Sequence, residues 1–417
     1  MKRLLIKNIG CLIQAVSHNQ GDTREKVAGD LMDKLPVIEN AYVLVEGERI
    51  IKIGTMPDCP NEADEVISLN GAWLMPTWCD PHTHIVFAGS RESEFQDKIK
   101  GLSYEEIYER GGGILNSVKR LRTTSEADLF NQANARVNEM IGFGTGAIEI
   151  KSGYGLSLEA ELKMLRVAKM LKQEHPSLII KSTFLGAHAV PLEYKERKQE
   201  YIRLVIEEML PQVAEQGLAD YCDVFCDKGF YTEDETDRIL QRATQLGLTP
   251  KIHANELDFS GGVQVGVKNK ALSVDHLECV GPDEIKALLH SETMPTLLPS
   301  TAFFLGLHYA PARKMIEAGL PIALATDYNP GSSPSGNFPF ILSLACIKMK
   351  MTPNEAIQAS TINSAYAMGV QKELGSIAVG KYASFIQLKA LPSLAYLPYA
   401  FGSNLIDKVM LKGQYVH

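Results

Sequence analysis

Two histidines that stand one residue apart, His82 and His84, shortly follow the apolar run Ala72–Met75. In an extended segment, residues i and i+2 point to the same side, so both imidazoles can reach one metal ion. Paired histidines also occur on protein surfaces, and the pair alone is therefore only moderately specific.

Two further residues that can bind a metal are associated with other apolar runs. His253 lies within one run, and Asp327 follows another. A single histidine is more often a satisfied core or surface residue than a ligand. Four such groups at matching strand ends instead predict a metal site made of His82, His84, His253 and Asp327. Three imidazoles and one carboxylate suit Zn²⁺ or iron with an open position for water, whose pKa the metal would lower.

Two residues near the predicted ligands could move protons. Glu256 stands three residues after His253 and could shuttle a proton to a leaving nitrogen, although a solvated loop glutamate is the alternative. His276 could orient the attacking water or bind Asp327, and a purely structural role stays open. We expect Glu256, His276 and Asp327 to be the catalytic residues.

The composition indicates an ordinary globular protein of 417 residues, 45% hydrophobic and 22% charged. A net charge of −8 argues against a nucleic-acid partner. The N-terminus is too short and polar for a signal peptide, and no apolar run approaches the ~20 residues of a membrane helix. Seven cysteines without a CxxC pair suit a reducing compartment. We expect a cytoplasmic protein, and a homodimer because twofold dimers are the commonest oligomers.

The elements that position these residues alternate along the chain. Strand-like runs are separated by amphipathic stretches such as 158–173 and 234–246, a pattern that predicts an α/β fold with a (β/α)8 barrel of ~250 residues. Active sites of such barrels lie at the carboxyl ends of the strands. The eight predicted strands are Ala72–Met75, Ala147–Ile150, Ile179–Leu185, Cys222–Cys226, Lys251–Ala254, Leu272–Val274, Thr296–Leu298 and Pro321–Ala325.

The two ends of the chain have a different texture. Strands are predicted at 4–6, 41–45 and 49–53. Near the other end of the chain, a helix begins with a capping box of Thr352 and Glu355, and short strands and turns are again predicted after it. We therefore expect residues 1–73 and 370–417 to form one small β-sandwich domain beside a barrel of residues 74–369.

The combination of these motifs resembles the amidohydrolase superfamily of metal-dependent hydrolases, and more closely the imidazolonepropionases within it. The resemblance covers nearly the whole chain. It is carried by Asp80-Pro81-His82-Thr83-His84, Ala88-Gly89-Ser90-Arg91, Arg110-Gly111-Gly112-Gly113-Ile114, Glu149-Ile150-Lys151-Ser152-Gly153-Tyr154-Gly155-Leu156, Gly186-Ala187-His188, His253-Ala254-Asn255-Glu256 and Asp327-Tyr328-Asn329-Pro330-Gly331-Ser332.

The resemblance implies hydrolysis of the cyclic amide of 4-imidazolone-5-propanoate to N-formimidoyl-L-glutamate in histidine degradation, with one Zn²⁺ or Fe³⁺ per subunit. Arg91 would grip the propionate in a bidentate fork, and His188 or the metal would stabilise the oxyanion. Ser332 stands where threonine is common, and Ser384 where aspartate is common. The residues implied to contact substrate or product are Arg91, Tyr104, Tyr154, His188, Glu256, Asn329, Gly331 and Ser332.

Three alternatives stay open. A nucleobase aminohydrolase also carries His-x-x-Glu after its fifth strand, but a neutral base gives no reason for the carboxylate clamp at Arg91. A binuclear enzyme would need a carboxylated lysine, for which Lys228 lies close to the required place. A catalytically inactive binding protein is disfavoured, since none of the four expected ligands is missing.

Overall fold

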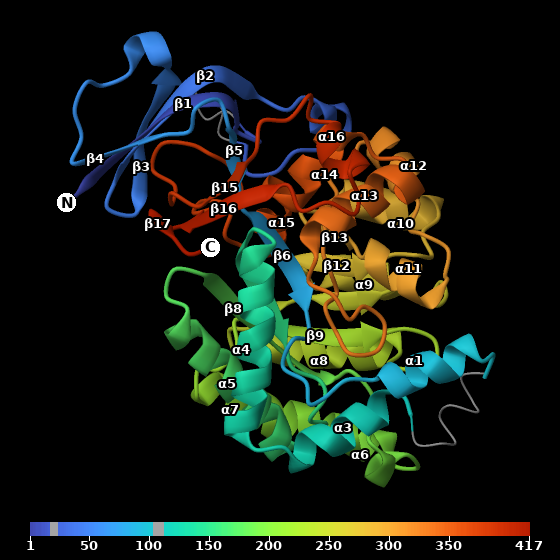
Figure 1. Cartoon of the computed structure of the whole chain (residues 1–417). Coiled ribbons are helices and arrows are strands. Elements are labelled where there is room, and N and C mark those ends of the chain that lie inside the picture. Colours follow the sequence, from blue (N-terminus) through green and yellow to red (C-terminus); the bar gives the residue numbers. More distant parts are fainter. Residues whose placement is uncertain (17–23, 103–111) are drawn as a thin grey trace.

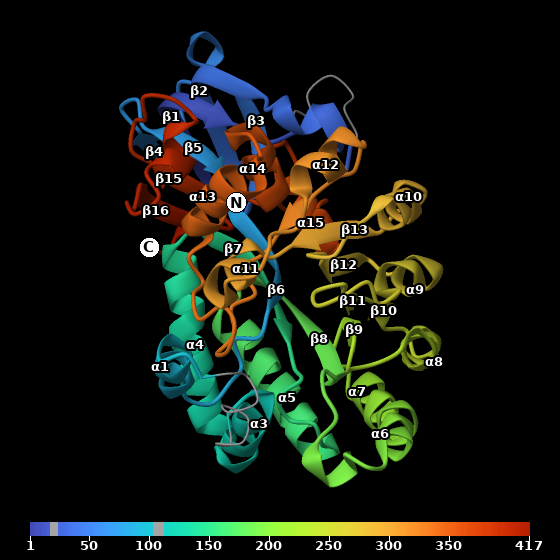
Figure 2. The same cartoon turned by 90° about the vertical axis from the view of Figure 1, so that its right-hand side faces the viewer.

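The computed structural model describes residues 1–16, 24–102 and 112–417. It contains two sheets: one is the inner wall of a barrel, and the other unites strands from both ends of the chain (Figure 1). Seen from the side, helices line the outside of the barrel (Figure 2).

The barrel wall runs in the order β14-β13-β12-β11-β9-β8-β7-β6, and all neighbouring pairs are parallel. A parallel bridge between Thr83 and Tyr328 connects the two edges, so the barrel is nearly closed. This arrangement confirms the predicted barrel. Its strands are β6 (Trp78–Thr83), β7 (Thr145–Lys151), β8 (Ile179–Ala187), β9 (Tyr221–Cys226), β11 (Ile252–Ala254), β12 (Ser273–His276), β13 (Met294–Leu297) and β14 (Ala323–Leu324), with β10 (Thr249–Pro250) beside β9.

Helices connect the barrel strands. One of them begins as its sequence predicts: Thr352 caps α14, and the capping box with Glu355 is present. A π-helical segment at Val205–Met209 separates the helix Lys198–Leu204 from the helix Leu210–Glu215. The helices are α1 (Glu92–Ile99), α3 (Ile114–Thr123), α4 (Glu126–Gly142), α5 (Leu158–Glu174), α6 (Lys198–Leu204), α7 (Leu210–Glu215), α8 (Glu233–Gln245), α9 (Gly262–Lys268), α10 (Pro282–Leu289), α11 (Pro299–Leu305), α12 (Ala312–Glu317), α13 (Phe338–Met349), α14 (Pro353–Ser360), α15 (Ile362–Ala367) and α16 (Tyr396–Tyr399).

The barrel is held by apolar packing between helices and strands. Val137 of α4 and Val167 of α5 are buried in one cluster with Ile148 of β7 and Ile180 of β8. Each such side chain contributes about 1.5–3 kcal/mol when fully buried. The strand ends that carry polar side chains therefore rest on a rigid scaffold.

The second sheet runs in the order β17-β16-β15-β5-β1-β2-β3, with β4 parallel to β1. The blue and red strands lie together in Figure 1, so the two ends of the chain combine as predicted. The strands are β1 (Arg3–Ile13), β2 (Val37–Glu46), β3 (Arg49–Thr55), β4 (Glu65–Ser68), β5 (Trp73–Pro76), β15 (Phe385–Leu388), β16 (Ile406–Leu411) and β17 (Gln414–Tyr415).

One strand assignment is wrong. The run Ala72–Met75, predicted as the first barrel strand, forms β5 in the second sheet, where Trp73–Pro76 pairs antiparallel with Phe385–Leu388. The first barrel strand is β6, which begins two residues later and contains His82 itself. The domain boundaries at 73/74 and 369/370 stay predictions.

Two further observations concern composition. All seven cysteines are free thiols, and Cys222 and Cys226 are buried, as expected from their strand. None of the described helices combines the length and the apolar character that crossing a bilayer requires.

Candidate active site

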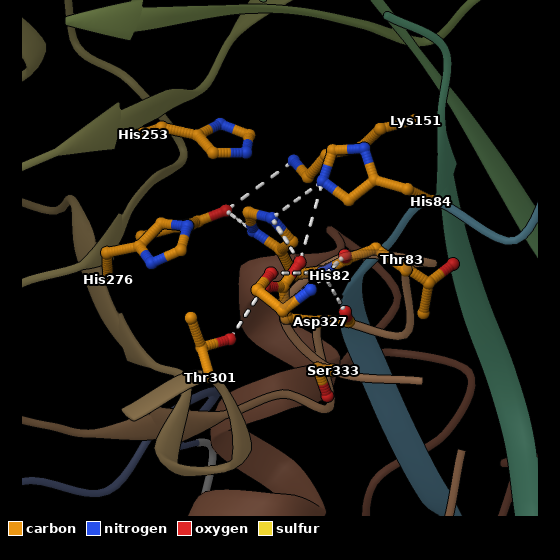
Figure 3. A network of polar contacts seen from close by, with 12 residues as sticks. His82, Thr83, His84, Lys151, His253, His276, Thr301, Asp327 and Ser333 are labelled. Atoms are coloured by element: carbon orange, nitrogen blue, oxygen red, sulfur yellow. Dashed lines mark hydrogen bonds and ion pairs between the residues drawn. The ribbon is translucent and has the colours of Figure 1, made fainter. Parts of the chain in front are cut away.

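Histidines and an aspartate from four parts of the chain meet at the carboxyl ends of the barrel strands (Figure 3). His82 Nε2 lies 3.2 Å from His84 Nε2, and each lies 3.6 Å from Asp327 Oδ1. These residues are brought together by β6 and the segment after β14, where Asp327 N–H donates to the carbonyl of His82. The three groups form one candidate metal triad.

A second candidate triad shares His82 and adds His253 of β11 and His276 of β12. The structure thus gathers the four expected ligands, with His276 as a fifth neighbour. His253 Nε2 is buried and has no hydrogen-bond partner among the described residues. Nitrogen and carboxylate donors with an unpartnered buried imidazole fit Zn²⁺ or iron. Which of the five groups bind the ion stays a prediction.

Burial sets the charge of the histidines. It lowers the pKa of His82, His84 and His276 well below the usual value, with further lowering from neighbouring positive groups. These imidazoles are therefore neutral near pH 7, which is the form that coordinates a metal.

The backbone is strained at two of these positions. His276 has φ 86° and Asp327 has φ 53°, in the left-handed region that residues other than glycine rarely adopt. Thr301 Oγ1 donates to Asp327 Oδ2 at 2.6 Å. Strain of this kind persists only where surrounding contacts fix it, and it is concentrated at functional sites.

Glu256 lies beside the cluster, with its Oε2 3.6 Å from His276 Nδ1. Burial, together with repulsion from Asp327 and Asp227, raises the pKa of Glu256 to about 8. Glu256 N–H donates to Asp227 Oδ2 at 2.7 Å, which fixes the loop. A carboxyl group that is protonated near neutral pH is suited to general-acid catalysis.

The raised pKa of Glu256 predicts a pH dependence of stability. Between pH 6 and 8 the folded protein keeps a proton on Glu256 that the unfolded chain has released, so the free energy of unfolding must fall as pH rises. Relative to Glu256→Gln, the metal-free protein should lose about 2 kcal/mol over this range. Urea denaturation of both proteins in the presence of a chelator measures the free energy of unfolding at each pH. Profiles of this free energy against pH that run parallel in the two proteins would contradict the prediction.

A cavity of about 450 Å³ opens above the cluster. Its polar lining includes every residue that was expected to contact substrate and is described by the structure, and aromatic and aliphatic side chains complete the wall. Tyr104 lies outside the described residues. The lining comprises His84, Arg91, Lys98, Ile114, Tyr154, His188, Phe225, Phe230, His253, Glu256, Leu257, His276, Leu305, Leu307, Asp327, Asn329, Gly331 and Ser332.

Arg91 reaches this cavity with its guanidinium fixed. Glu94 Oε2 accepts from Arg91 Nε at 2.9 Å and from Nη2 at 2.6 Å. Nη1 lies against Gly331, where any added Cβ would overlap it. Although burial favours the neutral acid, Arg91 and Asn116 lower the pKa of Glu94, which stays ionised. One edge of the guanidinium is therefore occupied, and a substrate carboxylate can use only the Nη1–Nη2 edge.

Comparison with known proteins identifies the family. Residues 73–416 match the model of the amidohydrolase family. The chain belongs to the amidohydrolase family. The imidazolonepropionase of Christiangramia forsetii is 54% identical over 99% of this chain and 100% of its own length, and that of Flavobacterium psychrophilum is 52% identical over the whole of both. The imidazolonepropionase of Alkaliphilus oremlandii is 43% identical over 99% of this chain and 97% of its own length.

Solved structures support the fold of this amidohydrolase. A zinc-bound adenosine deaminase from Xanthomonas campestris matches with a TM-score of 0.74 at 17% identity, covering 99% of this chain and 92% of its own. A triazine hydrolase from Arthrobacter aurescens matches with a TM-score of 0.77 at 13% identity, covering 100% of this chain and 95% of its own.

Two expected substrate contacts have other partners in the amidohydrolase structure. His188 Nδ1 lies 3.1 Å from the carbonyl of Gly153, and burial lowers the pKa of His188 to about 3. The neutral ring therefore carries its proton on Nδ1 and presents Nε2 as an acceptor, which suits a substrate N–H better than an oxyanion. Asn329 accepts from the N–H groups of Gly331 and Ser332 and so organises their loop.

Lys228 does not approach the amidohydrolase site. Its side chain is 76% exposed, and Nζ lies 2.8 Å from Asp258 Oδ2. It therefore offers no support for the second metal of a binuclear enzyme.

The sequence reasoning missed the charged residues beneath the histidines. Asp275 Oδ2 lies 2.7 Å from His82 Nδ1, and Asp223 Oδ2 lies 3.0 Å from His253 Nδ1. Lys151 contacts both aspartates, at 3.5 and 2.7 Å. The available signal was a charged residue inside an otherwise apolar barrel strand, where burial requires a partner.

Proposed function

We propose that this amidohydrolase is an imidazolonepropionase, which opens the ring of 4-imidazolone-5-propanoate to give N-formimidoyl-L-glutamate in histidine degradation. The observation that carries the proposal is that Arg91, the acid Glu256 and the histidine cluster line one cavity. A substrate with a carboxylate tail and a cyclic amide requires both ends of such a cavity. The names of relatives at 52–54% identity over the full chain agree with it.

The proposed cofactor is one Zn²⁺ or Fe³⁺ per subunit, held by His82, His84, His253 and Asp327. When bound, such an ion polarises a carbonyl oxygen and lowers the pKa of water. His276 lies within the same cluster and could orient water.

The chain's own residues account for binding and proton transfer. Arg91 pairs with the propionate through its free edge, and His188 Nε2 accepts the N–H of the ring. Water adds to the lactam carbonyl carbon and the C–N bond breaks, while Glu256 donates its proton to the departing ring nitrogen and takes up the proton that the water releases. The raised pKa of Glu256 keeps that proton available near neutral pH.

The direct test follows the loss of imidazolone propionate absorbance with purified protein before and after chelation. We expect hydrolysis that chelation removes and added Zn²⁺ or iron restores. Absence of hydrolysis above a Glu256→Ala control in a metal-loaded preparation would contradict the proposal.

A nucleobase aminohydrolase is the rival function, and Arg91→Met discriminates. The proposed function predicts a large loss of affinity for a substrate that bears a carboxylate, because the variant lacks the guanidinium edge that would pair with that carboxylate. Unchanged affinity would favour the aminohydrolase.

We also propose that the protein is a cytoplasmic homodimer. Cell fractionation tests the location, and light scattering after gel filtration tests the oligomeric state.

Glu94→Gln is expected to raise KM about 10-fold with little change in kcat. The amide of glutamine cannot form the ion pair that the Glu94 carboxylate makes with Arg91. Losing a hydrogen bond to a charged group costs about 1.5–3 kcal/mol, and part of this cost lowers the affinity for the substrate. Steady-state kinetics measures the split. A fall in kcat at constant KM would contradict the assignment of Glu94 as a residue that positions Arg91.

A further inference from the structure

A buried lysine lies directly beneath the histidine cluster. Lys151, the last residue of β7, is completely inaccessible to solvent, and Figure 3 shows it beside His84 and His82. Its Nζ lies 2.6 Å from Glu149 Oε1, 2.7 Å from Asp223 Oδ2 and 3.5 Å from Asp275 Oδ2. Burial disfavours the ammonium, but these three carboxylates raise the pKa of Lys151 above its usual value, so it stays charged.

Each aspartate bound by Lys151 also faces a histidine. Asp275 Oδ2 accepts from His82 Nδ1, and the same oxygen lies near Lys151. Asp223 Oδ2 accepts a hydrogen bond from Lys151 Nζ and lies 3.0 Å from His253 Nδ1. The other oxygen of Asp223, Oδ1, accepts the backbone N–H of His253. At His82 the acceptor at Nδ1 places the proton there and leaves Nε2 free for a metal; at His253 the carboxylate lies close to Nδ1 but outside hydrogen-bond geometry among the described residues.

We propose that Lys151 is a positioning residue that joins the pairs Asp275–His82 and Asp223–His253 into one unit and so fixes both imidazoles for metal binding. The inference rests on the proposed metal centre. The three carboxylates are inaccessible to solvent and would repel one another more strongly without the ammonium. Each aspartate could then turn away from its histidine. Both rings would then lose a fixed tautomer and orientation.

Lys251 offers a matched control. It is equally buried and also contacts Glu149, but its other partners are the carbonyls of Pro81 and Ala367, each at 3.1 Å. It makes no ion pair with Asp223 or Asp275 among the described contacts. Burial raises the pKa of Asp275, and the charges of Lys251 and Lys151 both lower it, so at that aspartate the two lysines differ in direct contact and not in the presence of a nearby charge. Replacing either lysine with methionine removes one buried charge, but only Lys151→Met removes the bridge between the aspartates.

The test is the affinity for Zn²⁺, measured by competition with a chromophoric chelator on the full-length protein. We expect Lys151→Met to weaken binding about 10–100-fold, as changes beneath metal-ligating histidines typically do, and Lys251→Met to change it less than about 3-fold. Equal losses in the two variants would overturn the inference, because a buried charge alone would then explain them.

A second readout is independent of metal and of activity. In metal-free protein with ¹⁵N-labelled histidine, NMR should show a single tautomer with the proton on Nδ1 for His82 and His253. Lys151→Met should mix the tautomers, and Lys251→Met should not. Unmixed tautomers in Lys151→Met would overturn the inference.

If Lys151→Met does not fold by circular dichroism, Lys151→Gln keeps a donor without the charge and is measured in the same way. Wild-type affinity in that variant would overturn the role of the ammonium. If the wild-type protein itself binds no Zn²⁺ or iron, the proposed metal centre fails first, whereas normal wild-type binding with unaffected Lys151 variants removes only this inference.

Discussion

Asp327→Ala is expected to lose the bound metal, and its turnover is expected to fall at least about 10⁴-fold. The fall follows because the metal would lower the pKa of water by many units. Asp327 Oδ1 lies 3.6 Å from the Nε2 atoms of both His82 and His84 and supplies the carboxylate among the expected ligands. Metal content by mass spectrometry and hydrolysis of imidazolone propionate measure the two effects. One metal per chain with normal turnover in the variant would contradict the prediction.

The control for this experiment is Lys228→Ala. Because Lys228 is exposed and paired with Asp258, its replacement should leave metal content and turnover unchanged. The same variant tests the binuclear alternative, which predicts a lower metal content when that lysine is removed.

Glu256→Gln is expected to lower turnover by about 10²–10⁴-fold while the metal stays bound. The amide preserves size and removes only the proton that the carboxyl group donates. If protonated Glu256 is the acid, as proposed, wild-type turnover should decline as pH rises through the pKa of this group, which burial raises to about 8.

The pH profile provides the control for Glu256. The residual activity of Glu256→Gln should lack the decline near pH 8, because the variant has no carboxyl group at that position. A decline that persists in the variant would assign it to another group, and retained turnover would exclude Glu256 as the acid.

Much of the barrel could be predicted from the sequence because strand-like runs and amphipathic helices alternate regularly. The error at Ala72–Met75 has a physical reason. Only Thr77 separates β5 from β6, and both strands are largely buried. Local pattern identifies strands, but the sheet that each joins depends on partners such as Phe385–Leu388, more than 300 residues away.

The candidate site was predictable where its residues follow short-range patterns. His82 and His84 are close in sequence, and Glu256 follows His253 by three positions. The supporting charges were not predictable in the same way. Lys151 meets Asp223 and Asp275 only through the order of strands in the barrel. Glu94, by contrast, follows Arg91 by three positions at the start of α1, so a spacing argument could have found that pair.

The placement of β5 between β1 and β15 has a consequence for synthesis on the ribosome. The edge of β5 that pairs with Phe385–Leu388 must wait for about 300 further residues, roughly 15–60 s at about 5–20 residues per second. During this interval the nascent chain exposes an unpaired strand edge of the kind that promotes aggregation. Truncation before residue 385 would make that exposure permanent, so the last tenth of the polypeptide covers a strand edge that is made within its first fifth.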